Sequence, residues 1–148
     1  MDWAVSVIRT LLTLTLILEV SHASAQEITL DHITAAVCQV ESGVIWEGPG
    51  IVSGRFILGG SGELGPWQAM PYTVSALGRS EGRNRSSVHY AETTFRIWYS
   101  RLLQKHGSHA EALAAYHRGS AGRHRKDAKA YAERCMNLAE RLAKEAKQ

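Results

Sequence analysis

Apolar side chains recur at helical spacing in three stretches of this chain. These stretches are residues 31–42, 87–106 and 128–142, and a capping-box pattern predicts a further, short helix over residues 108–116. The apolar positions are Ile33, Ala36, Val37 and Val40; then Val88, Ala91, Phe95, Trp98 and Leu102; then Ala128, Tyr131, Cys135, Leu138 and Leu142. Residues three and four apart share one face of a helix, so the sequence predicts amphipathic helices in these stretches.

Residues 44–70 separate the first two helices and have a different composition. They contain seven of the 13 glycines and two of the three prolines, with no helical period. Two short apolar pieces, residues 51–52 and 56–58, flank Gly54, which is typical of a small hairpin or a plain loop. A long Gly-rich segment inside a small domain usually carries function. We therefore expect an α+β fold, mostly α, with a Gly-rich loop or small hairpin after the first helix.

The N-terminal residues have the pattern of an export signal. Arg9 precedes the apolar run of residues 11–18, and small residues up to Ala25 provide a cleavage site. Asp2 and Glu19 weaken the pattern, and the alternatives are an amphipathic anchor or an uncleaved tether. No apolar run reaches ~18 residues, so no membrane-spanning helix is expected. The expected organisation is a signal peptide, residues 1–25, and one periplasmic or secreted domain, residues 26–148.

Basic residues concentrate at the C-terminal end. Residues 121–148 hold 8 Lys and Arg against 4 Asp and Glu, a net charge of +4, whereas residues 26–120 hold 8 of each. A nucleic-acid surface is one interpretation, but the basic cluster at residues 123–126 precedes an amphipathic helix with interspersed acids and few aromatic side chains. For an exported protein, this charge favours an anionic cell wall as the partner.

Glu41 is the residue with the clearest chemical interpretation. It follows Val37 by four positions, so it lies on the flank of the apolar face of its helix, beside the Gly-rich segment. Partial burial disfavours a charged carboxylate and raises its pKa, which suits a general acid. From spacing alone, an exposed glutamate in a last helical turn is the simpler interpretation. The motifs around Glu41 favour the other interpretation, a partly buried general acid.

Four short motifs occur in order along the chain. The residues that carry them are Glu41 and Ser42 in the first; Gly65, Gln68 and Pro71 in the second; Ala115, Tyr116 and Gly119 in the third; and Tyr131 in the last helix. They resemble the Glu-Ser pair, the G-L-M-Q-x-x-P segment, the A-Y-N-A-G segment and the C-terminal tyrosine of the lytic transglycosylases with the soluble-transglycosylase, lysozyme-like fold. The resemblance covers nearly all of residues 26–148, and it indicates the small specialised type associated with secretion or conjugation systems.

The resemblance implies cleavage of the β-1,4 bond between N-acetylmuramic acid and N-acetylglucosamine in peptidoglycan. Glu41 is then the catalytic residue, which protonates the departing oxygen and later takes the proton of the muramic C6 hydroxyl to close a 1,6-anhydro ring. The substrate's own N-acetyl group stabilises the charge at the anomeric carbon. The implied substrate-binding residues are Ser42, Trp67, Gln68, Tyr116, His117 and Tyr131. No cofactor or metal is expected, and the histidines have no metal-ligand spacing.

The motifs depart from the family pattern at several positions. Pro66 and Trp67 replace Leu and Met, His117 replaces Asn, and Arg118 replaces Ala. Sugar rings stack on exposed aromatic side chains in such clefts, so Trp67 is expected at the surface. The imidazole of His117 either donates a hydrogen bond to substrate or is an ordinary surface group.

Glu63 is the candidate for a second carboxylate. It lies two residues before Gly65. Lysozyme-type enzymes use a second carboxylate to stabilise the cation or to orient a water. A solvated loop glutamate is the alternative interpretation, and Glu47 is a weaker candidate with no motif around it.

The expected function is therefore a lytic transglycosylase for local cell-wall remodelling. The alternatives are a muramidase that adds water with the help of Glu63, and a non-catalytic peptidoglycan-binding protein with the same fold. The expected partners are peptidoglycan glycan strands and a secretion, conjugation or phage machine, with no nucleic acid.

Cys38 and Cys135 are the only cysteines of the chain. In an oxidising compartment such a pair usually forms a disulfide. Cys38 shares a helix face with Glu41, and Cys135 shares one with Tyr131, so a bond between antiparallel helices brings Glu41 and Tyr131 opposite each other. This matches the family pattern, in which the C-terminal tyrosine hydrogen-bonds the catalytic glutamate. Two buried free thiols are the alternative.

Overall fold

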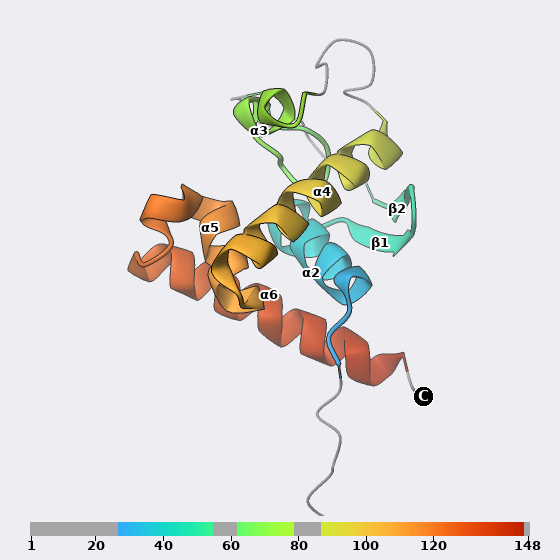
Figure 1. The fold of residues 1–148 in the computed structure, drawn as a ribbon. Helices are drawn as coiled ribbons and strands as arrows, with labels where there is room; N and C mark the ends of the chain where they lie inside the picture. Colours follow the sequence, from blue (N-terminus) through green and yellow to red (C-terminus); the bar gives the residue numbers. More distant parts are fainter. Residues whose placement is uncertain (1–26, 55–61, 79–86, 147–148) are drawn as a thin grey trace, which may run out of the picture.

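The computed structural model describes residues 27–54, 62–78 and 87–146, and the predicted signal peptide lies outside them (Figure 1). In this part of the chain the fold is α+β and mostly α, with one two-stranded antiparallel sheet, as expected. The elements in chain order are α2 (Leu30–Ser42), β1 (Ile45–Gly48), β2 (Ile51–Ser53), α3 (Pro71–Ala76), α4 (Val88–His106), α5 (His109–Gly122) and α6 (Lys126–Glu145).

Helix α2 confirms the first predicted helix, and its ends are set by local interactions. Thr29 caps the N-terminus: its side chain accepts a hydrogen bond from the backbone N–H of His32, and the His32 ring accepts one from the backbone N–H of Thr29. Gly43 ends the helix with φ 71°, and its N–H donates to the carbonyl of Gln39. These ends leave Glu41 in the last turn of α2.

The other predicted helices are confirmed, with one difference in length. Helix α4 ends at Gly107, and the Ser108 side chain caps α5 by accepting from the backbone N–H of Glu111. Helix α5 extends past the predicted end near Tyr116 because a second helical piece follows a break at Gly119, where φ is 72° and ψ is 164°. Short helix α3 was not predicted, since six residues carry too few turns for a recognisable period.

The core forms where α6 packs against α5 and α2, and where α4 packs against the same two helices (Figure 1). Aromatic rings fill its centre. Phe95 contacts Trp67, Tyr99 and Tyr116, with ring centroids 6.2, 5.6 and 5.3 Å away. The exposed position predicted for Trp67 is therefore wrong: its side chain is fully buried, and its indole N–H donates to the carbonyl of Thr34 at 2.9 Å. A core site provides more apolar contact for the indole than a cleft wall does.

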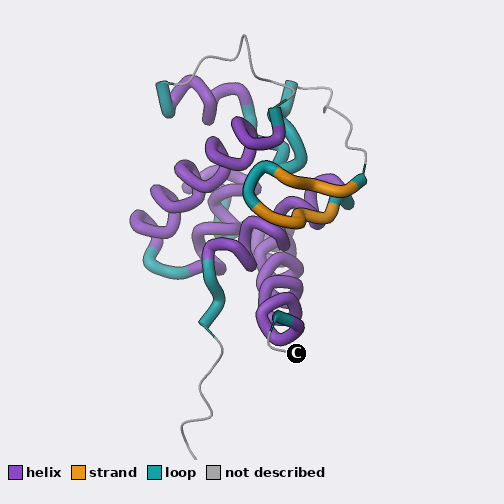
Figure 2. Tube along the Cα trace, turned by 90° about the vertical axis from the view of Figure 1, so that its right-hand side faces the viewer, coloured by secondary structure: helices purple, strands orange, loops and turns teal. Residues whose placement is uncertain are grey.

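The Gly-rich segment contains a hairpin, and the predicted piece at residues 51–52 lies in β2 (Ile51–Ser53), but the partner of β2 is β1, which was not predicted. Strand β1 pairs with β2, and the turn between them lies at residues 49–50 (Figure 2). The predicted partner, residues 56–58, lies outside the described residues. Buried Glu92 holds the hairpin to α4. Its carboxylate accepts hydrogen bonds from the Trp46 indole N–H at 3.1 Å and from the Gly50 backbone N–H at 2.7 Å. Arg96 donates to the same carboxylate at 2.8 Å, so the buried charge is compensated.

The predicted disulfide is wrong. Cys38 and Cys135 are buried free thiols. The Cys38 thiol donates to the carbonyl of Val44 at 3.3 Å, and burial raises the pKa of each thiol to about 12. Both cysteines act as small core residues, the role that their places on apolar stripes also permit.

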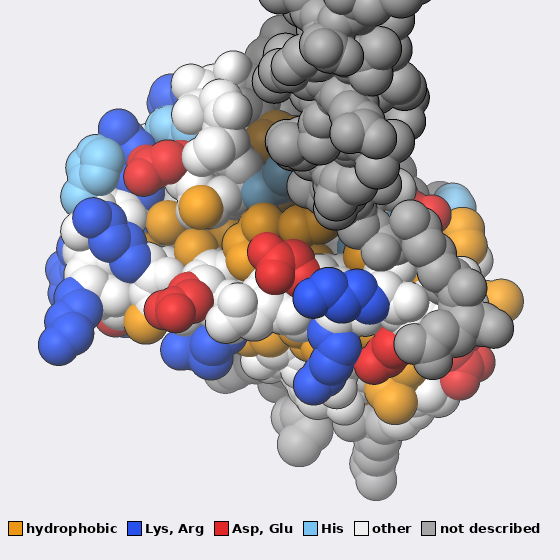
Figure 3. Space-filling model, turned by 90° about the horizontal axis from the view of Figure 1, so that it is seen from below, with side chains coloured by type: hydrophobic (Ala, Val, Ile, Leu, Met, Phe, Trp, Pro, Cys, Tyr) orange, Lys and Arg blue, Asp and Glu red, His pale blue; other side chains and the backbone are white. Residues whose placement is uncertain are grey.

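Helix α6 carries much of the charge of the C-terminal segment. On the face seen from below, basic and acidic side chains alternate, with hydrophobic side chains between them (Figure 3). The net positive charge of this segment therefore does not form a uniform basic surface on that face. Among the described helices, none combines the length and apolarity needed to cross a membrane.

Candidate active site

A tight loop between the hairpin and α3 forms one wall of the site. Its ends are bridged by backbone hydrogen bonds from Leu64 N–H to the Ala69 carbonyl at 2.8 Å and from Ala69 N–H to the Leu64 carbonyl at 3.2 Å. Gly65 has φ 59°, and a Cβ at this position would lie 2.4 Å from the Cβ of Ala91. Only glycine fits this close approach of the loop to α4. Gln68, three residues later in the same loop, also has a positive φ, 51°.

Two further hydrogen bonds fix this loop. The Gln68 side-chain amide donates to the carbonyl of Gly65 at 2.8 Å. The hydroxyl of Tyr116, from α5, donates to the carbonyl of Trp67 at 2.6 Å. Because burial raises the pKa of Tyr116 well above its usual value, this hydroxyl stays protonated and keeps donating. The loop is thus held to both α4 and α5.

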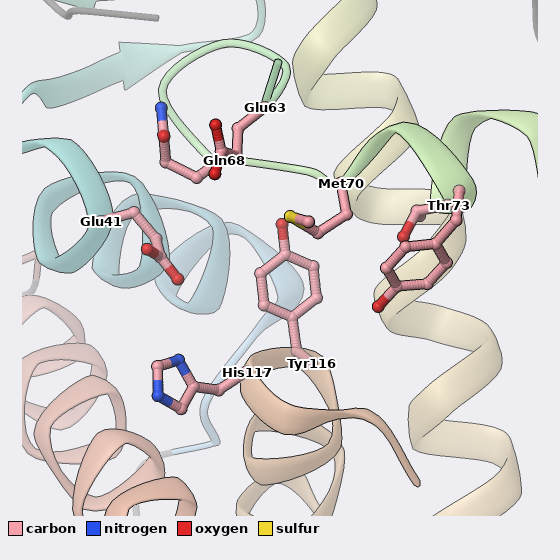
Figure 4. A pocket seen from close by; sticks show the side chains of 8 residues that line it. Glu41, Glu63, Gln68, Met70, Thr73, Tyr116 and His117 are labelled. Atoms are coloured by element: carbon pink, nitrogen blue, oxygen red, sulfur yellow. The ribbon is translucent and has the colours of Figure 1, made fainter. Parts of the chain in front are cut away.

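The loop, α2, α3 and α5 enclose a cavity of about 280 Å³ (Figure 4). The residues that line it are Glu41, Glu63, Gln68, Met70, Tyr72, Thr73, Tyr116 and His117. Figure 4 shows Glu41 and His117 directed into the same space from different helices, with Glu63 and Gln68 on the loop above them. Tyr116 stands in the middle, between Glu41 and the α3 residue Thr73.

Glu41 is the half-buried carboxyl of this cavity. Burial raises its pKa above the usual value for a glutamate, and the nearby charge of Glu63 acts in the same direction. The Tyr131 hydroxyl and the Arg134 guanidinium both act in the opposite direction. Burial is the largest of these effects, so the proton is held more tightly than on a solvated glutamate. A carboxyl with this property, facing an open polar cavity, is suited to general acid catalysis.

Tyr131 and His117 form a stacked pair beside Glu41. Their ring centroids are 4.4 Å apart, and the planes differ by 9°. The Tyr131 hydroxyl is buried beside Glu41, but it makes no hydrogen bond of good geometry with any described residue. Burial and the charges of Arg118 and Arg134 lower the pKa of His117, whereas Asp127 acts against them. His117 is therefore mainly neutral near pH 7, and it can donate or accept a hydrogen bond.

The structure brings most of the predicted site residues together. Glu41, Glu63, Gln68, Tyr116 and His117 line one cavity, and Tyr131 lies directly behind Glu41. The remaining candidates lie elsewhere. The Ser42 hydroxyl donates to the carbonyl of Cys38 at 2.8 Å, and Glu47 is exposed on β1.

Sequence reasoning missed three residues of the cavity wall: Met70, Tyr72 and Thr73. They surround Pro71, whose match to the second motif was a sign that its neighbours belong to the same wall. In the described residues, no group of three or more His, Cys, Asp or Glu side chains has the arrangement of a metal site.

Comparison of the chain with models of known protein families, with characterised proteins and with solved structures finds no match. The chemical interpretation of the cavity therefore depends on its own geometry. That geometry combines a carboxyl of raised pKa, a second carboxyl, an amide, a mainly neutral imidazole and the Tyr116 hydroxyl, with the Tyr131 hydroxyl buried beside Glu41.

Proposed function

We propose that this chain is an exported peptidoglycan lytic transglycosylase with a lysozyme-like fold. The observation that carries the proposal is the position of Glu41. Burial raises the pKa of its carboxyl, and this carboxyl lines an open cavity that also contains Gln68, Tyr116 and His117. These are residues of the motifs that resemble the transglycosylase family.

In the proposed reaction Glu41 first acts as an acid. Its proton goes to the glycosidic oxygen between N-acetylmuramic acid and N-acetylglucosamine, and the C–O bond at the anomeric carbon breaks. The substrate's acetamido oxygen attacks that carbon and holds its positive charge, so a second protein carboxylate is not required. This step leaves Glu41 ionised.

Glu41 then acts as a base. It accepts the proton of the muramic C6 hydroxyl while that oxygen bonds to the anomeric carbon and displaces the acetamido oxygen. The product is a 1,6-anhydro ring, and Glu41 is protonated again. Tyr131 supports this cycle, because burial raises its pKa well above the usual value and keeps its hydroxyl available to the Glu41 carboxylate.

A muramidase is the second candidate, and one observation favours it. Glu63 lines the same cavity as Glu41, and its charge raises the pKa of Glu41. In a hydrolase, Glu63 orients a water toward the anomeric carbon, and the product has a reducing end instead of an anhydro ring.

Digestion of purified peptidoglycan followed by mass analysis of the soluble products tests the proposal. Anhydro ends support the transglycosylase, and reducing ends support the muramidase. If intact sacculi bind the protein and no fragments appear, the chain is a binding protein. Glycan strands are the proposed substrate, and a secretion, conjugation or phage machine is the proposed context for local wall opening.

A further inference from the structure

Tyr72 is an exposed aromatic side chain at the wall of the cavity. Its relative exposure is 55%, and neighbouring Met70 is 37% exposed, although both line the same space as Glu41. Leaving so much apolar surface in water forgoes the stabilisation that burial provides. Both side chains come from the start of α3 and the residue before it, and they add apolar surface to a cavity that also holds two carboxyls and an amide.

The backbone that carries Tyr72 is held in place. Pro71 begins α3 and fixes its own φ, while the two residues that follow Tyr72, Thr73 and Val74, are buried. The Tyr72 side chain therefore projects from an anchored helix. A tyrosine in this setting has few torsions to restrict when a ligand binds, which lowers the entropic cost of binding.

This surface lies away from the proposed reaction centre. Tyr116 stands between Glu41 and Thr73, the residue after Tyr72 in α3 (Figure 4). Tyr72 also lies close enough to Tyr116 to raise the pKa of that hydroxyl. Glu41 and Tyr72 thus both lie near Tyr116, and an oligosaccharide is long enough to contact all three residues.

We propose that Tyr72, supported by Met70, is the platform on which a neutral N-acetylated sugar ring of the glycan strand stacks, next to the sugars that Glu41 cleaves. The aromatic role that the sequence suggested for Trp67 belongs to Tyr72, since Trp67 is fully buried. A pyranose has one face made mainly of C–H groups, which packs against an aromatic face and removes apolar area of both from water. The inference rests on the proposed function for the identity of the ligand, but its test does not require turnover.

The test is a binding titration in a chain that does not consume its ligand. The probe is the β-1,4-linked tetramer of N-acetylglucosamine, titrated calorimetrically into the Glu41→Gln variant. In this background Tyr72→Ala is expected to weaken binding about tenfold, equivalent to ~1.4 kcal/mol. Tyr72→Phe keeps the aromatic face and should stay within about twofold of the parent.

Ile51→Ala is the matched control. Ile51 is 57% exposed, close to the value for Tyr72, but it lies on β2 and does not line the cavity. Both positions are at the surface, so neither alanine variant is expected to unfold the chain. Tetramer affinity should be unchanged in Ile51→Ala.

The outcomes separate the platform from the proposed reaction. If Tyr72→Ala binds the tetramer as the parent does, or if the parent does not bind it, the platform is wrong, whatever peptidoglycan digestion shows. If Tyr72→Ala weakens binding while the wild-type chain releases no fragments from peptidoglycan, the platform stands and the enzymatic proposal fails.

Discussion

The imidazole of His117 lies parallel to the ring of Tyr131, with the two centroids 4.4 Å apart. This contact joins α5 to α6 immediately beside Glu41. The guanidinium carbon of Arg134 lies 5.9 Å from the centre of the same Tyr131 ring. The positive charge of Arg134 on α6 therefore acts on two titratable groups of the cavity: it opposes the rise in the pKa of Glu41 and adds to the lowering of the pKa of His117.

Arg134→Gln is expected to raise the pKa of both Glu41 and His117. Removal of a nearby positive charge makes the carboxylate less favourable and the imidazolium more favourable, so both groups hold their protons to higher pH. NMR titration of the Glu41 carboxyl carbon and the His117 ring measures the two values. Arg141→Gln is the control, because Arg141 is exposed on the same helix and pairs with Glu145. Unchanged values in Arg134→Gln, or shifts in opposite directions, contradict the electrostatic account.

Gly65→Ala is expected to destabilise the fold and to disrupt the loop that carries Gln68. The new methyl group would lie 2.4 Å from the Cβ of Ala91, and the backbone would hold alanine at φ 59°. Overpacking costs ~1–3 kcal/mol, and a left-handed alanine adds ~1–2 kcal/mol. Chemical denaturation measures the loss.

Gly43→Ala separates these two costs. Gly43 has φ 71°, but a Cβ there meets no atom within 4 Å, so this variant should show only the backbone cost. Adding Ala91→Gly to Gly65→Ala should recover part of the stability by removing the clash. If Gly65→Ala is no less stable than Gly43→Ala, the close approach of the loop to α4 is not real.

The sequence predicted those elements whose pattern is local. Helices α2, α4 and α6 follow from apolar spacing, and their caps follow from single residues such as Gly43 and Ser108. Residues 51–52 were predicted and lie in β2, but their partner β1 was not predicted, because this pairing depends on a distant group. Glu92 holds β1 and the turn through Trp46 and Gly50, more than 40 residues earlier in the chain, and no local pattern reveals that contact.

The sequence motifs predicted most residues of the candidate site, but they did not predict which side chains are buried and which are exposed. Glu41, Gln68, Tyr116 and His117 line the cavity as the motifs indicated. The exposure of an aromatic side chain depends on tertiary packing, so the sequence assigned to Trp67 the exposed position that Tyr72 occupies. The same limitation applies to the cysteines, since the presence of two cysteines does not establish that their sulfurs meet in the fold.

The reactivity of the two thiols tests directly whether Cys38 and Cys135 are free. In the native chain at pH 8, Cys38 and Cys135 should react slowly with a thiol reagent, because both are buried and burial raises the pKa of each to about 12. Two thiols should become titratable on unfolding without reductant. A mass 2 Da below that of the reduced chain, together with no thiol after unfolding, would show that the disulfide forms after all.

Glu63→Gln distinguishes the two enzymatic candidates. For the transglycosylase, the variant should still release anhydro products, slowed at most moderately, and the pKa of Glu41 should fall because a neighbouring negative charge is gone. For the muramidase, it should lose nearly as much activity as a Glu41 variant. Mass analysis of fragments from the two variants, run side by side, decides between these results.

Glu41→Gln should alter the dependence of stability on pH. Since the folded-state pKa of Glu41 is raised, its contribution to stability is fully present below the unfolded value of ~4.3 and is lost as pH rises through the folded value. Glutamine does not ionise, so the variant does not lose this contribution. Its free energy of unfolding, relative to that of the wild type, should therefore increase as pH rises to 7. A relative loss over this range would mean that the folded protein stabilises the Glu41 carboxylate.

The same substitution tests the central claim most directly, through the initial rate at which 1,6-anhydro ends are released from purified peptidoglycan. Wild-type chain and Glu41→Gln are compared at equal concentration, after thermal unfolding has shown both to be folded. We predict a rate about 10²–10⁴-fold lower for the variant, because glutamine keeps the size of the side chain and removes its transferable proton. If a folded Glu41→Gln variant retains most of the wild-type rate, Glu41 is not the catalytic acid.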